Sequence, residues 1–175
     1  MLEDSSEAND HTPKRYVKVA LLIGAAVFIL DQATKMLAVY WWRGEALPIE
    51  IFGRYFRFVH AANPGAAWGM FSDYTGLLTI FSLLVMILLI WQFPKMTEGQ
   101  PERVAALAAL IGGVAGNLVD RAVRGEVVDF IDVHLHFYNW PVFNIADSAI
   151  TLGVIVFAIS VVWREASKKD LHEAN

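Results

Sequence analysis

The chain has 175 residues, of which 56% are hydrophobic and 18% charged, with a net charge of −4 and a mean hydropathy of +0.44. Soluble domains are typically about 45–50% apolar and about 25% charged, so this composition indicates a single-domain integral membrane protein. The absence of cysteine excludes disulfides, a thiol nucleophile and Cys-ligated metal centres. The sequence has no basic patch interleaved with aromatic residues outside the flanks of its apolar stretches, which argues against nucleic acid as a partner.

The first 13 residues are polar and acidic, which predicts a disordered cytoplasmic tail. Residues 14–166 are expected to form one membrane domain, followed by a cytoplasmic tail over 167–175. The domain contains four apolar stretches, each near the roughly 20 residues that a transmembrane helix needs. They run from about Val17 to Val39, Tyr74 to Phe93, Arg103 to Val123 and Val142 to Trp163.

The first stretch has an alternative interpretation as a cleaved signal peptide. Its uninterrupted apolar run, from Val19 to Leu30, has a suitable length. However, no small-x-small cleavage site follows closely, and Asp31 and Lys35 interrupt the sequence. A transmembrane helix is therefore favoured.

Basic residues set the predicted orientation, because cytoplasmic flanks of membrane spans carry an excess of Lys and Arg. One set of span ends carries Lys14, Arg15, Lys18, Lys95, Arg103, Arg164, Lys168 and Lys169. The opposite set carries Arg43, Arg54, Arg57, Arg121 and Arg124. The larger group places both termini in the cytoplasm.

Two connections then lie on the outer side, over residues 43–73 and about 124–141. Within them, IEIFGRYFRFVH and VVDFIDVHLHFYNW are rich in alternating, β-branched and aromatic residues, which predicts short strands. The sequence thus indicates an all-α membrane fold of four transmembrane helices with a small β-like cradle on the outer leaflet. The pairs Ala109/Gly113 and Gly112/Gly116 predict close helix packing by the third span.

Several polar residues lie inside the apolar stretches. Asp31 and Lys35 are four residues apart and share a helix face, either as a structural ion pair or as a pair that orients an active site. Gly113, Asn117 and Arg121 form one stripe of the third span, with Asp120 pointing elsewhere, and either a structural network or a site is possible there. Asn144, Asp147, Ser148 and Thr151 form a polar stripe of the fourth span.

Two carboxylates stand out because apolar sequence surrounds each of them. Asp129 lies in GEVVDFIDV and Asp147 in FNIADSAI, although a charge at the centre of a bilayer helix costs about 2.5–3.5 kcal/mol. Asp147 is five residues past Val142, or roughly 8 Å into the membrane at about 1.5 Å per residue. Two nearby carboxylates share a proton, so that one can activate water while the other protonates a leaving group.

Other chemistries have weaker support. Asp132, His134 and His136 alternate in DVHLH and could place metal ligands on one face of a strand, but no HExxH helix accompanies them. Ser148 and Lys35 could form a Ser–Lys pair. A proton-coupled transporter could use the two carboxylates as a relay, and a scaffold could use the small-residue packing.

The chain resembles a known family at these residues. GGVAGNLVDRAVRGEVVDFIDV and FNIADSAI are similar to two signature blocks of the bacterial lipoprotein signal peptidases, or type II signal peptidases, and DQATK and NPGAAWG to the other two. The resemblance extends over about residues 17–163. It implies an aspartic membrane endopeptidase with four transmembrane helices, an outer cradle and Asp129 and Asp147 as the catalytic dyad.

The resemblance also implies roles for other residues. Supporting or substrate-binding positions are Asn63, Gly113, Asn117, Arg121, Asn144 and Ala146, with structural support from Asp31 and Lys35. Asn117 and Asn144 would flank the dyad, and Arg121 would position substrate. Pro64 and Trp68 depart from the family's usual residues.

The implied substrates are prolipoproteins whose cysteine already carries diacylglycerol, cut just before that cysteine. The enzyme would lie in the bacterial cytoplasmic (inner) membrane with its active site at the outer leaflet. It would contact membrane lipids, act as a monomer, and need no metal or other cofactor.

Overall fold

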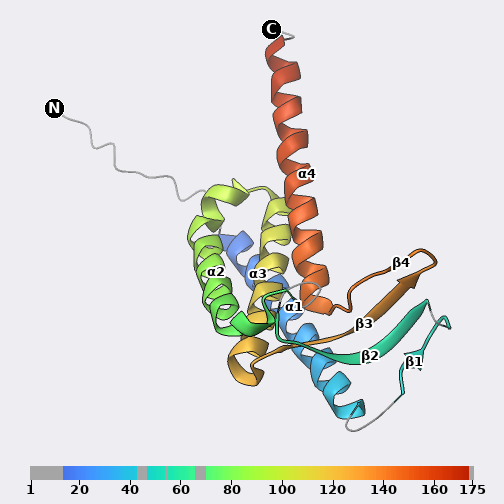
Figure 1. The fold of residues 1–175 in the computed structure, drawn as a ribbon. Coiled ribbons are helices and arrows are strands. Elements are labelled where there is room, and N and C mark those ends of the chain that lie inside the picture. Colours follow the sequence, from blue (N-terminus) through green and yellow to red (C-terminus); the bar gives the residue numbers. More distant parts are fainter. Residues whose placement is uncertain (1–13, 43–46, 54, 66–69, 174–175) are drawn as a thin grey trace.

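The computed structural model describes residues 14–42, 47–53, 55–65 and 70–173. Four long helices carry a small sheet at the end of the bundle where α1 finishes and α4 begins (Figure 1). The elements in chain order are α1 (Lys14–Trp41), β1 (Ile49–Glu50), β2 (Phe56–Asn63), the 3-10 helix η2 (Ser72–Tyr74), α2 (Thr75–Thr97), α3 (Pro101–Arg124), β3 (Val127–Leu135), β4 (Tyr138–Asn139) and α4 (Ile145–Glu173). The predicted tail over residues 1–13, and Arg43, Arg54 and Trp68, lie outside the described residues.

The predicted helices and sheet are confirmed. Each of the four helices contains a segment long and apolar enough to cross a membrane, namely Arg15–Trp41, Thr75–Thr97, Pro101–Arg124 and Ile145–Ser167. The fourth helix begins at Ile145 rather than Val142, because the backbone of Phe143 is hydrogen-bonded to Phe130 and Ile131 of β3. At its other end α4 continues to Glu173.

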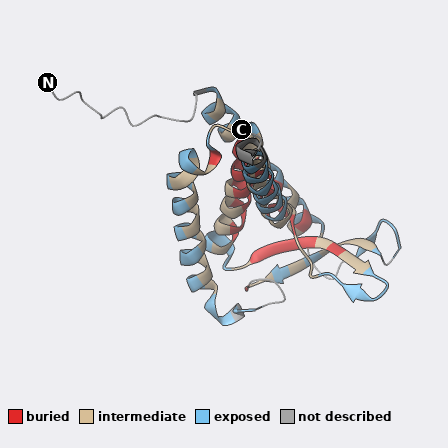
Figure 2. Ribbon diagram, turned by 90° about the horizontal axis from the view of Figure 1, so that it is seen from above, coloured by how far each residue is buried: buried red, intermediate tan, exposed pale blue. Residues whose placement is uncertain are grey.

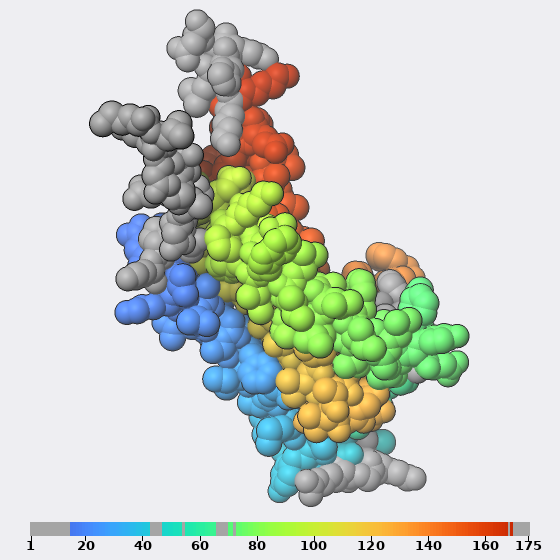
Figure 3. Space-filling model, turned by 90° about the vertical axis from the view of Figure 1, so that its left-hand side faces the viewer, coloured from blue at the N-terminus to red at the C-terminus, as the bar shows by residue number. Residues whose placement is uncertain are grey.

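Helix α3 forms the centre of the bundle. In its most apolar window 61% of the residues are buried, against 6% for α1, 0% for α2 and 17% for α4. Figure 2 shows the buried residues concentrated along α3 and β3. The helix surfaces turned outward on α1 and α2 are apolar, and Figure 3 shows these two helices on one face of the molecule. Such surfaces suit contact with lipid.

Glycines let α3 approach its neighbours closely, as the small-residue pairs predict. A Cβ atom on Gly112 would lie 2.5 Å from the carbonyl oxygen of Gly24 in α1. A Cβ atom on Gly113 would lie 2.6 Å from the carbonyl oxygen of Ala146 in α4. Neither position can accept a larger side chain without a backbone shift, so both contacts depend on glycine.

The sheet is antiparallel with strand order β1-β2-β3-β4. Strand β2 pairs with β3 so that Ala61 lies opposite Asp129, and the register shifts between Phe58 and Ala61. The side chains of Val128 and Phe130 pack with Ala38 of α1 in a buried cluster. This packing fixes the first half of β3 against the helices. Asp129 lies between Val128 and Phe130, and its side chain therefore points to the opposite face of the strand.

Candidate active site

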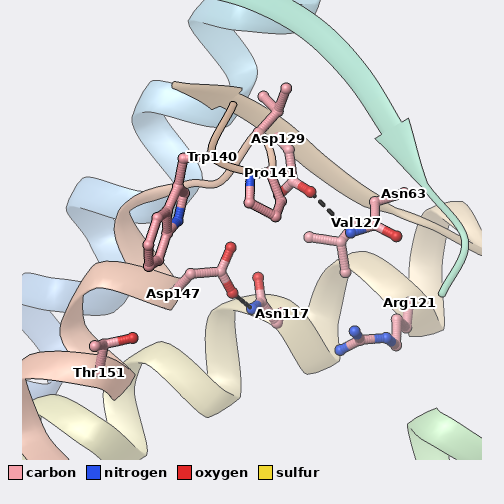
Figure 4. Close-up of a pocket in the computed structure, with 10 residues that line it drawn as sticks. Asn63, Asn117, Arg121, Val127, Asp129, Trp140, Pro141, Asp147 and Thr151 are labelled. Carbon is pink, nitrogen blue, oxygen red and sulfur yellow. Dashed lines mark hydrogen bonds between the residues drawn. The ribbon is translucent and has the colours of Figure 1, made fainter. Parts of the chain in front are cut away.

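A pocket of about 210 Å³ lies where β3 meets α3 and α4. Figure 4 shows Asp129 and Asp147 on its wall, together with Asn63, Asn117 and Arg121. The remaining wall residues are Val127, Trp140, Pro141, Val142 and Thr151. The structure thus brings together five residues that the sequence analysis selected from four separate elements.

Asp129 is buried, with 2% of its surface exposed. One carboxylate oxygen accepts a hydrogen bond from Asn63 Nδ2 at 2.9 Å, and the other accepts one from Asn144 Nδ2 at 2.7 Å. Burial, and then the negative charge of Asp147, raise the pKa of Asp129 to about 7, against the opposing effect of these hydrogen bonds and of Lys35. This carboxyl can therefore hold a proton close to neutral pH.

Asp147 occupies the first turn of α4, where it forms a reciprocal cap with Asn144. The backbone N–H of Asp147 donates to Asn144 Oδ1 at 2.9 Å, and the backbone N–H of Asn144 donates to Asp147 Oδ2 at 3.2 Å. This is the pattern of a capping box, and a negative charge is favourable at a helix N-terminus. Asn117 Nδ2 donates to the other oxygen, Oδ1, at 2.8 Å.

Asn144 therefore contacts both carboxylates. Its side-chain amide donates to Asp129 and its backbone N–H donates to Asp147. The residue has no exposed surface, so these bonds do not compete with bulk water. The same amide lies 3.2 Å from Asn117 Oδ1, which links the two asparagines that the resemblance places beside the dyad.

Arg121 lies one helical turn beyond Asn117 on α3. Its Nη2 donates to the carbonyl oxygen of Gly65 at 3.1 Å, and Asn63 Oδ1 accepts a bond from the N–H of Gly65 at 3.1 Å. Among the described residues, Arg121 Nε is a buried donor without a partner. A buried unpaired donor is costly, and this one belongs to a residue that also lines the pocket.

The other predicted positions lie behind this wall. Gly113 contacts the backbone of Ala146, whose N–H donates to Asp31 Oδ1 at 2.9 Å. Asp31 and Lys35 form the predicted ion pair at 2.8 Å, and both are fully buried. Asp120 does not line the pocket, but it also lies 2.8 Å from Lys35, a contact that the sequence analysis missed.

The weaker alternatives do not fit the geometry. Asp132 is paired with Arg57 at 2.5 Å, and His134 contacts both residues. The Arg57 guanidinium therefore takes the position beside Asp132 and His134 that a metal ion would need. Within the described ranges no cluster of three or more His, Cys, Asp or Glu side chains could hold a metal ion. Ser148 Oγ donates to the carbonyl oxygen of Asn144 rather than meeting Lys35.

Some wall residues carried no recognisable sequence signal. Val127, Trp140 and Pro141 line the pocket, yet in the sequence they are ordinary strand, membrane-interface and helix-start residues. Asp120, which the sequence analysis directed away from the Asn117 stripe, had a usable signal, because residues three positions apart on a helix are neighbours.

Comparison with known proteins agrees with the fold and the motifs. The sequence model of the family described as "Signal peptidase (SPase) II" matches residues 23–163. The chain is 34% identical over 158 residues to a lipoprotein signal peptidase of Staphylococcus haemolyticus, covering 90% of this chain and 98% of that protein. It is 38% identical over 150 residues to one of Desulforapulum autotrophicum, covering 82% and 91%.

Solved structures give the same result. One described as a bacterial membrane enzyme, determined by the in meso method at 2.3 Å resolution, superposes with a TM-score of 0.80 at 33% identity, covering 87% of this chain and 92% of that one. A second, at 1.9 Å resolution, has a TM-score of 0.74 at 34% identity, covering 83% and 93%. The extent of these matches shows that the chain belongs to the signal peptidase II family.

Proposed function

We propose that this chain is an intramembrane aspartic endopeptidase that removes the signal peptide from diacylglyceryl-modified prolipoproteins. The scissile bond is the one just before the lipidated cysteine. The observation that carries the aspartic mechanism is the bridge by Asn144, which holds Asp129 and Asp147 on one pocket wall. Family membership supports the peptidase activity and the class of substrate.

The two carboxyls share one proton in the working form of the site. The ionised carboxylate takes a proton from water as the water oxygen bonds to the scissile carbonyl carbon. The protonated carboxyl first polarises the carbonyl oxygen and then supplies the proton that the departing amine needs as the C–N bond breaks. The balance is simple hydrolysis, and the titration belongs to the pair rather than to either residue.

Arg121 supports binding of the substrate backbone. Its guanidinium remains protonated under all ordinary conditions and can donate to an oxygen acceptor in the pocket. The buried Nε without a partner supports this role, and the bond from Nη2 to Gly65 fixes the orientation of the group.

The position of the pocket suits a lipid-anchored substrate. It lies at the sheet end of the bundle, where α1 finishes and α4 begins, and opposite the end where α4 finishes (Figure 1). With both termini in the cytoplasm, this end faces the outer leaflet of the bacterial inner membrane. A cysteine held by diacylglycerol in that leaflet would present its preceding peptide bond at this depth, while the apolar helix surfaces contact surrounding lipid.

The substrate class can be tested with a matched pair of substrates. Purified protein in detergent or lipid is incubated with a prolipoprotein carrying diacylglyceryl-cysteine and with the same prolipoprotein lacking the lipid, in the presence of a metal chelator. We expect cleavage of the modified form only, with lipidated cysteine as the new N-terminus by mass spectrometry. Equal cleavage of both forms, or a different new N-terminus, would contradict the proposed specificity.

A further inference from the structure

Three charged side chains are enclosed together behind the pocket, and we call them the Lys35 cluster: Asp31, Lys35 and Asp120. All three have no exposed surface. Lys35 Nζ lies 2.8 Å from Asp31 Oδ2, 2.8 Å from Asp120 Oδ2 and 2.8 Å from Asn117 Oδ1, which uses all three donors of the ammonium group. Arg124 also pairs with Asp120, so two positive charges balance two negative charges.

Each member of the cluster contacts a residue close to the pocket carboxylates. That residue is either the sequence neighbour of Asp129 or Asp147, or a hydrogen-bond partner of Asp147. Asp31 Oδ1 accepts the backbone N–H of Ala146, the neighbour of Asp147. Asp120 Oδ2 lies 3.3 Å from the backbone N of Val128, the neighbour of Asp129. Lys35 contacts Asn117, which itself bonds to Asp147. A cluster needed only to join helices would not require these three connections.

The contact between Lys35 and Asn117 determines which way the side-chain amide of Asn117 faces. Its Oδ1 accepts from Lys35 Nζ at 2.8 Å and from Asn144 Nδ2 at 3.2 Å, so Nδ2 is directed to Asp147 Oδ1. With the amide reversed, its NH₂ group would face the Lys35 ammonium and its oxygen would face a carboxylate. Both contacts would be repulsive, and the buried location offers no water to relieve them.

We infer that Lys35, within this buried cluster, is a positioning residue for the proteolytic site: it holds the Asn117 amide in the orientation that donates to Asp147. This inference rests on the proposed aspartic peptidase function and adds a residue on α1 to the machinery of that site. Lys35 does not line the pocket, so its effect passes through Asn117. Its loss should therefore lower kcat while leaving substrate binding, and hence KM, nearly unchanged.

The test removes Lys35 without leaving an unbalanced charge. The double variant Asp31→Asn/Lys35→Met does this and keeps the Asp120–Arg124 pair. A second, Lys35→Met/Asp120→Asn, keeps the net charge but leaves Asp31 without its cation partner. Folding is followed by thermal unfolding in detergent, and cleavage of diacylglyceryl-modified prolipoprotein gives kcat and KM. We expect both variants to fold and to lose about 10²-fold in kcat, the effect of a small misplacement in an active site.

The control removes an ion pair at the other end of α3, in which Arg103 is buried and Glu98 is exposed. Arg103 pairs with Glu98 at 2.9 Å and is 5% exposed, and Arg103→Met/Glu98→Gln should keep the wild-type kcat. A second comparison combines each double variant with Asn117→Ala. Because both changes act through one amide, the combination should be no slower than Asn117→Ala alone.

Several outcomes would overturn the inference. It is wrong if both charge-balanced variants keep the wild-type kcat, if their losses multiply with that of Asn117→Ala, or if the Arg103 control loses as much activity. It is also wrong if neither double variant folds, because the cluster would then be a requirement of folding alone. Failure of the wild-type protein to cleave would instead refute the proposed function on which the inference rests.

Discussion

Asn144 combines two structural tasks in one side chain. Its amide holds Asp129, and its backbone and side-chain oxygen cap the helix that carries Asp147. We expect Asn144→Ala to lower kcat by about 10²-fold because both carboxylates lose their common partner. Loss of a helix cap typically costs about 1 kcal/mol of stability, so thermal unfolding should shift to lower temperature.

Ser148→Ala is the matched control for this change. Ser148 Oγ bonds only to the carbonyl oxygen of Asn144 among the hydrogen bonds found for it in the described structure. That variant should retain its kcat. If Asn144→Ala cleaves at the wild-type rate, the bridge between the carboxylates has no catalytic importance.

The raised pKa of Asp129 predicts a pH dependence of stability. Its pKa is about 7 in the folded protein and about 3.9 in an unfolded chain, so folding favours the protonated form. The contribution to stability is complete below about pH 4 and is lost as pH rises to about 7. We therefore expect Asp129→Asn, which cannot ionise, to raise the unfolding temperature most at pH 7 and above, with little difference at pH 4. A constant difference across this range would contradict the assignment.

Sequence patterns identified single residues well and their partners poorly. Asp129 and Asp147 stood out because charged residues are costly within apolar sequence. Helix periodicity placed their common contact, Asn144, only on a polar stripe, and the family resemblance alone placed it beside the dyad. The bond from Asp120 to Lys35 joins residues 85 positions apart on different helices, and helix periodicity carries no information about which faces of two helices meet.

At the scale of elements, the packing of α3 depends on its glycines. Gly112→Ala would place a Cβ atom 2.5 Å from the backbone of Gly24, and overpacking of this kind typically costs about 1–3 kcal/mol. We expect this variant to unfold at a lower temperature than the wild type. Gly76→Ala on α2 is the control, because its Cβ would meet nothing within 4 Å, and alanine favours a helix over glycine. Equal effects of the two changes would show that close approach of α1 and α3 is unimportant.

Element types could be predicted because apolar length and alternation indicate helices and strands directly. The ends were less predictable. The start of α4 moved from Val142 to Ile145 because Phe143 bonds to β3, an interaction between segments that no local pattern records. The register shift between Phe58 and Ala61, which accompanies the pairing of Ala61 with Asp129, also arises only when the two strands pair.

At the scale of the whole molecule, the proposed function requires the sheet on the outer side of the membrane. The natural chain has no cysteine, so single cysteines can report topology without background labelling. In cells, Phe137→Cys, in the exposed connection between β3 and β4, should react with a membrane-impermeant maleimide, whereas Ser167→Cys near the end of α4 should react only after lysis. Reaction in the reverse order would place the pocket at the wrong leaflet.

The measurement that tests the central claim most directly compares three Asp→Asn variants in cleavage of diacylglyceryl-modified prolipoprotein. Asp129→Asn and Asp147→Asn alter the proposed dyad, whereas Asp132→Asn alters a buried carboxylate of the same strand that is paired with Arg57. With all three folded, we expect no detectable product from the first two and product from the third. Cleavage that survives either dyad substitution would contradict the aspartic mechanism.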